Sequence, residues 1–171
     1  MDALFLIGRI LFGLLFVVSG IAGHFLGYQQ LKGYAAAKKF PLAGPAVLVS
    51  GIMIVLGGIG IAAGVWPDLS ALAIAVFLFF TTFFIHDFWT VKDDAMMRLN
   101  EMTQFQKDLA LLGAALVFFA VTAYGGEFGP TLTDPLFDLW RRVSRPAASV
   151  VSREGSSSIP PPPARRGDHP S

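Results

Sequence analysis

Four long apolar blocks with almost no charge constrain this 171-residue chain more than any other feature. They cover about Ala3–Leu26, Pro45–Trp66, Leu69–Ile85 and Leu109–Gly126. A helix needs about 20 residues to cross the hydrocarbon of a bilayer, and each block meets or nearly meets that length with its flanks. The blocks do not alternate polar and apolar residues, as the strands of a membrane barrel do. The sequence therefore predicts an all-α membrane protein, a bundle of four transmembrane helices.

The composition supports the bilayer as the main solvent. Hydrophobic residues make up 54% of the chain and charged residues 15%, which is outside the usual range of soluble domains. The net charge is +1 and the basic residues form short clusters, so nothing indicates nucleic-acid binding. The chain has no cysteine, which excludes disulfides, thiolate catalysis and Cys-ligated metals. It also lacks a P-loop, a GxSxG elbow, an HExxH motif and a dinucleotide fingerprint, so redox chemistry would need a bound cofactor or a partner.

The chain divides into three regions by composition. Residues 1–127 hold the four predicted helices. Residues 128–145 contain "DPLFDLWRRV", whose apolar residues share one helical face beside two arginines, as in a short interfacial amphipathic helix. Residues 146–171 are rich in Pro, Ser and Arg and are predicted to be a disordered tail.

Four crossings determine which segments share a membrane face. The N-terminus, the Trp66–Leu69 turn and the C-terminal tail lie on one side, here called face A. Loops at Tyr28–Gly44 and Asp87–Gln106 lie on the other, face B. We expect Asp68 to cap the third helix, and the capping-box spacing of Thr103 and Gln106 to open the fourth. Basic residues in short loops lean weakly towards a cytoplasmic face B.

Most of the polar residues near the helix ends gather at face B, whereas Arg9 stands alone near face A. One interpretation is boundary chemistry, since polar side chains at helix ends avoid the cost of a mid-membrane charge. The other is a polar vestibule for a quinone headgroup, another small ligand or a partner. The candidate ligand-binding residues are His24, His86, Asp87, Gln104, Lys107, Asp108 and Arg9.

In the vestibule interpretation each residue has a role. His86 would exchange protons, because imidazole titrates near neutral pH. Asp87 would orient His86, and Lys107 would polarise a carbonyl oxygen. No metal site is predicted, because two histidines lack a third and fourth ligand. We expect Arg9 either to snorkel to the headgroups or to pair with Asp68.

Several stretches, in order, resemble the DoxX family of small four-helix bacterial membrane proteins. They are "GRILFGLLFVVSGIAG", "GGIGIAAGVWPDLSALAIA", "HDFW", "QFQKDLALLGAAL" and "YGGEFGPTLTDPLF", which together cover about residues 4–138. Two positions depart from the family pattern. A Glu that members often carry in the second helix corresponds to about Ile54, and an Asn after the fourth-helix Lys is Asp108. The missing carboxylate at Ile54 weakens a proton-relay mechanism.

The resemblance implies an integral protein of the bacterial inner membrane that is associated with oxidoreductase complexes. Similar proteins include a small subunit of a thiosulfate–quinone oxidoreductase and a membrane component linked to thiol and oxidative-stress enzymes. We expect an accessory subunit without catalysis of its own. A quinone- or small-ligand-binding subunit and a membrane chaperone or scaffold are the alternatives. The expected partners are the lipid bilayer and oxidoreductase or stress-enzyme subunits, and self-association stays open.

Overall fold

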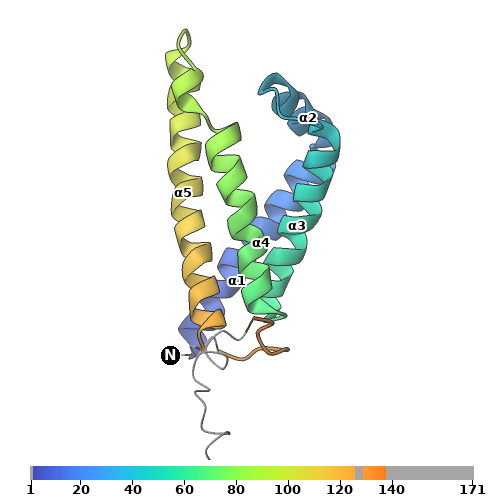
Figure 1. Cartoon of the computed structure of the whole chain (residues 1–171), viewed down its shortest axis with the longest axis vertical. Helices are drawn as coiled ribbons and strands as arrows, with labels where there is room; N and C mark the ends of the chain where they lie inside the picture. Colours follow the sequence, from blue (N-terminus) through green and yellow to red (C-terminus); the bar gives the residue numbers. More distant parts are fainter. Residues whose placement is uncertain (1, 126–128, 138–171) are drawn as a thin grey trace, which may run out of the picture.

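The computed structural model describes residues 2–125 and 129–137 and contains only helices and connecting segments in that part of the chain (Figure 1). Four segments are long and apolar enough to cross a membrane, namely Ala3–Leu26, Ala43–Ala63, Pro67–Thr90 and Ala95–Ala123. The predicted all-α membrane bundle with four spans is thereby confirmed. The elements are α1 (Asp2–Ser19), η1 (Gly20–Leu26), α2 (Tyr28–Ala37), α3 (Ala43–Ala63), α4 (Pro67–Phe80), η2 (Thr81–Ile85), η3 (Phe88–Thr90) and α5 (Ala95–Ala123).

The helices form two pairs that meet at face A and diverge towards face B. In Figure 1, α4 and α5 lie together on the left, α1 rises from the lower left behind α4 to lie beside α3 on the right, and α2 lies at the top of α3. Small residues bring α1 and α3 close, since a Cβ added at Gly13 would stand 2.3 Å from the carbonyl oxygen of Gly58. Between the pairs the core is aliphatic and aromatic. Its members include Phe16, Ile54, Ile61, Ile74, Leu78, Leu112 and Ala115.

Helix α5 begins well before the position that the sequence indicated. Its N-cap is Asp94, whose Oδ1 accepts a hydrogen bond from the backbone N–H of Met97 at 2.9 Å. Thr103 therefore lies inside the helix, where its hydroxyl donates to the carbonyl of Leu99, and the predicted capping box is wrong. The cap lies upstream of the predicted start, because the first half of α5 is polar and no apolar block marks it in the sequence. The loop predicted at Tyr28–Gly44 likewise contains a helix, α2.

Asp68 is not the N-cap of α4, which is Trp66, although its Oδ1 accepts a hydrogen bond from the first-turn N–H of Leu69 at 2.8 Å. It lies at the second position of that helix, after Pro67, and its side chain is fully buried. Oδ1 accepts from the backbone N–H of Leu136 at 2.9 Å, and Oδ2 accepts from the N–H of Phe137. The carboxylate thus binds a segment that follows α5, residues 129–137, here called the strap. This role depends on two residues that are distant in the sequence, so the sequence alone does not show it.

The strap closes the bundle at face A. The carbonyl of Gly64 accepts from the N–H groups of Leu132 and Thr133 at 3.0 and 3.2 Å. Arg9, only 2% exposed, donates from Nη2 to the carbonyl of Pro130. The expectation that Arg9 snorkels is therefore wrong: the strap supplies an oxygen at its depth. Residues 138–145 of the predicted amphipathic segment and the predicted disordered tail, 146–171, lie outside the described residues.

Candidate functional site

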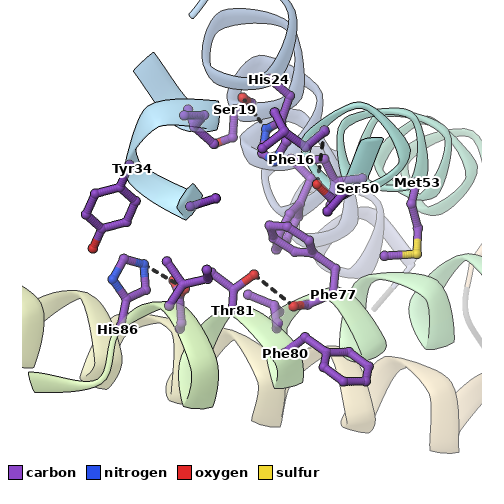
Figure 2. Close-up of a pocket in the computed structure, with 18 of the residues that line it drawn as sticks. Phe16, Ser19, His24, Tyr34, Ser50, Met53, Phe77, Phe80, Thr81 and His86 are labelled. Atoms are coloured by element: carbon purple, nitrogen blue, oxygen red, sulfur yellow. Dashed lines mark hydrogen bonds and ion pairs between the residues drawn. The ribbon is translucent and has the colours of Figure 1, made fainter. Parts of the chain in front are cut away.

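A cavity of about 660 Å³ lies between the two helix pairs in the half of the bundle nearer face B. We call it the vestibule. Its walls come from α1, η1, α2, α3, α4, η2 and α5, and most of its surface is apolar. Figure 2 shows Tyr34 and His86 towards one end and Met53 and Phe80 towards the other. Phe80 is 48% exposed and also lines the cavity, so the apolar end borders the lipid-facing surface between α3 and α4.

Two π-helical segments position the two histidines of the vestibule. His24 lies in η1, and His86 directly follows η2. A π turn adds a residue to the helical repeat and often marks a functional site. The wall opposite His24 is a glycine, because a Cβ at Gly51 would stand 2.5 Å from the Cβ of His24. The sequence thus turns both imidazoles towards the cavity, and His24 fits there because α3 has no side chain at this point.

His86 is held by a carboxylate that the sequence did not single out. Its Nδ1 is 2.9 Å from Oε2 of Glu101, and its Nε2 is 3.7 Å from Oδ2 of Asp108. Asp87, its neighbour in the chain, instead accepts a hydrogen bond from Lys38, the residue that follows α2. The orienting role assigned to Asp87 therefore passes to Glu101.

Glu101 is the centre of the polar network. It is 2% exposed, and its Oε1 accepts from the hydroxyl of Tyr34 while lying 3.7 Å from Nζ of Lys38. A buried carboxylate is stable when opposite charges and donors surround it, and here α2, the segment after η2 and α5 all contribute. Burial raises the pKa of Tyr34, and the hydrogen bond and negative charge of Glu101 raise it further. Tyr34 therefore stays protonated and donates.

Lys107 and Asp108 lie where the network meets the cavity. Nζ of Lys107 is 3.3 Å from Oδ1 of Asp108 and also donates to Gln104. The side chain of Lys107 is 55% exposed, whereas that of Asp108 is 7% exposed. Asp108 therefore presents a buried carboxylate to the vestibule, and Lys107 stands at its mouth.

The structure brings most of the candidate residues together. Four of them line the vestibule: His24, His86, Lys107 and Asp108. Asp87 and Gln104 bind Lys38 and Lys107 beside it. Arg9 belongs to the closed end at face A, so it is no part of this site. Among residues 2–125 and 129–137, no group of three or more His, Asp or Glu side chains is placed to hold a metal ion.

Sequence reasoning missed Tyr34, Lys38 and Glu101. The signal for Glu101 was present, because residues seven apart share a helical face and Asp108 is seven residues later. This signal was missed because the fourth helix was predicted to begin after Glu101, at Thr103. Tyr34 and Lys38 carried no such signal, since the segment that contains α2 was predicted to be a loop. Although Ile54 occupies the place of the family's Glu, α5 supplies two buried carboxylates of its own, Glu101 and Asp108.

The fold and the cavity define a class: a multi-pass α-helical membrane protein with a polar-ended vestibule between two helix pairs. Residues 4–87 match the family model described as DoxX, which confirms the resemblance seen in the sequence. These residues therefore form a DoxX-family domain. The match ends before α5, so the likeness of residues 88–138 stays a prediction. Searches of curated proteins and of solved structures each found no match.

Proposed function

We propose that this protein is an accessory subunit of an oxidoreductase assembly in the bacterial inner membrane and holds a quinone-class molecule in the vestibule. The resemblance supplies the association with oxidoreductases. The observation that carries ligand binding is the vestibule itself, which joins an apolar body to a polar end containing His86 and has His24 in its wall. Such cavities, mostly apolar with a few converging polar groups, are typical of small-molecule sites.

The geometry suits an amphipathic ligand that is already dissolved in lipid. The ring would lie near His86 and Asp108, and an isoprenoid tail would leave past Phe80 towards the bilayer. His86 would exchange a proton with a ring oxygen through Nε2, because Glu101 holds Nδ1. Glu101 acts as a positioning residue, since it touches the imidazole and not the ligand.

Electrons must come from another subunit. The chain has no cysteine and no nucleotide-binding fingerprint, so its own residues offer no electron carrier. The accessory role follows from this division of labour: this chain binds and positions, and a partner oxidises or reduces. Purification from native membrane under mild detergent is expected to retain an oxidoreductase partner, which mass spectrometry would identify. Robust turnover by the isolated chain would contradict the accessory role.

Ligand binding is tested by titrating the purified protein in lipid nanodiscs with a decyl benzoquinone. The His86→Ala variant is expected to bind about tenfold more weakly, the effect of about one lost polar contact in a buried site. Asp93→Asn, which changes an exposed carboxylate in the face-B loop, is the matched control and should bind as the wild type does. Absence of binding, or equal affinity in the wild type and His86→Ala, would refute the quinone site.

A further inference from the structure

We infer that the vestibule prefers the reduced form of its ligand, the quinol, because its buried polar groups offer hydrogen-bond acceptors and almost no free donors. This inference rests on the proposed function and specifies it. A quinone ring presents two carbonyl oxygens that only accept, whereas a quinol presents two hydroxyl groups that donate. The number of free donor hydrogens in the cavity therefore determines whether the quinone or the quinol binds more tightly.

In each of the two histidines, one ring N–H already has an acceptor within the protein. Nδ1 of His24 faces the carbonyl of Ser19 at 3.5 Å, and Nδ1 of His86 faces the carboxylate of Glu101 at 2.9 Å. Carbonyl and carboxylate oxygens only accept, so in each contact the hydrogen lies on Nδ1. In the neutral ring, Nε2 then carries a lone pair. Both imidazoles thus offer acceptors to the cavity.

The half-buried hydroxyl groups also donate their hydrogens to acceptors within the protein. Ser50 donates to the carbonyl of Val47 at 3.1 Å, and Thr81 donates to the carbonyl of Phe77 at 2.9 Å (Figure 2). A hydroxyl has one hydrogen and two lone pairs, so each oxygen can still accept. The hydroxyl of Tyr34 likewise donates to Glu101. These three side chains add acceptors and no donor.

Asp108 completes the set. It is 5% exposed and lines the cavity, and its carboxylate oxygens lie 3.3 Å from Nζ of Lys107 and 3.7 Å from Nε2 of His86. No hydrogen bond within the described residues ends on its carboxylate, although a carboxylate can accept about four. A distance of 3.7 Å is also too long for a hydrogen bond from His86. A buried carboxylate in this condition gains most from a ligand that donates.

The remaining donors lie on exposed residues at the cavity margin. Ser19, Gln30 and Lys107 all line the vestibule and are exposed, and Lys107 already donates to Gln104. Water can satisfy their hydrogens whether or not a ligand is bound. The groups that lose water when the cavity fills are the acceptors, and an unpaired buried acceptor is costly. The quinol pairs them and the quinone does not.

The test uses three ligands with the same decyl tail: the benzoquinone, its quinol, and the quinol with both hydroxyl groups methylated. Titrations of the full-length protein in nanodiscs are done anaerobically. The quinol is expected to bind at least about tenfold more tightly than the quinone, the value of about one satisfied buried acceptor. The dimethyl ether, which has the same ring but no donor, should bind no more tightly than the quinone. Such a preference raises the midpoint potential of the bound two-electron couple by about 30 mV.

A variant tests the residue assignment. Asp108→Asn replaces one acceptor oxygen by an NH₂ donor, so the quinol preference is expected to shrink at least about threefold, whereas Asp93→Asn leaves it unchanged. Should Asp108→Asn fail to fold, the dimethyl ether still decides the question in the wild type. Equal binding of quinol and quinone, or tighter binding of the quinone or the ether, would overturn this inference while leaving the quinone-class site intact. If no form binds, the proposed function fails and the inference fails with it.

Discussion

The two ends of the bundle both bury charged side chains, but they satisfy them in different ways. At face A, Asp68 and Arg9 bind backbone groups of the strap, and the end is closed. At face B, Glu101 binds the side chains of Tyr34 and His86, Asp108 lies beside Lys107 and His86, and a cavity remains next to them. Backbone partners fix a chain in place, whereas side-chain partners can be exchanged for a ligand. The same residue types therefore serve architecture at one end and binding at the other.

The largest expected effect breaks the closed end. Asp68→Ala removes the acceptor of the N–H groups of Leu69, Leu136 and Phe137, and a hydrogen bond to a charged group contributes about 1.5–3 kcal/mol. We expect about 3 kcal/mol of lost stability, measured by thermal unfolding in detergent with circular dichroism. Asp134→Ala, an exposed carboxylate on the same strap, should change little. Equal melting temperatures for Asp68→Ala and wild type would remove the architectural role.

A smaller effect is expected from the open end. Glu101→Gln removes the charge that Tyr34, Lys38 and His86 share, at about 2 kcal/mol. Because those contacts join α2 to the other helix pair, amide hydrogen exchange in α2 should accelerate while α3 stays protected. Asn100→Ala, an exposed neighbour on α5, is the control. Unchanged amide exchange in α2 would show that the contacts of Glu101 do not stabilise this helix.

The smallest effect is a pH dependence confined to the open end. Because the pKa of Tyr34 is raised in the folded protein, its contribution is full below the unfolded-state pKa of about 10. It is lost as the pH rises through the higher folded-state value. Stability should therefore fall above about pH 10, and Tyr34→Phe should flatten that fall. Identical alkaline profiles for wild type and Tyr34→Phe, followed by chemical denaturation, would contradict the role given to its hydroxyl.

The sequence predicted the spans well because the apolar content of a membrane helix depends on local composition alone. It also gathered His24, His86, Lys107 and Asp108 at one face, since an even number of crossings requires it. It failed where partners lie far apart. His86 was paired with Asp87 by adjacency, whereas the structure pairs it with Glu101, fifteen residues later.

Three further misses have physical causes. A polar helix such as α2, or the first half of α5, has no hydrophobic block to mark it. The prediction of helices from apolar blocks therefore missed both. The π-helical segments that aim His24 and His86 leave no recognised pattern in the sequence. Asp68 lies beside a turn and was predicted to be a cap; besides the adjacent N–H of Leu69 it binds two N–H groups that are sixty-eight and sixty-nine residues away, which no local pattern shows.

The glycine opposite His24 carries a consequence for how this site can vary. Even a methyl group at position 51 would stand 2.5 Å from the histidine Cβ, so the imidazole would have to move to admit it. The position of this imidazole in the cavity wall thus depends on an atom that is missing from α3. Enlarging that single residue offers a way to displace His24 while every hydrogen-bonding group keeps its chemical identity.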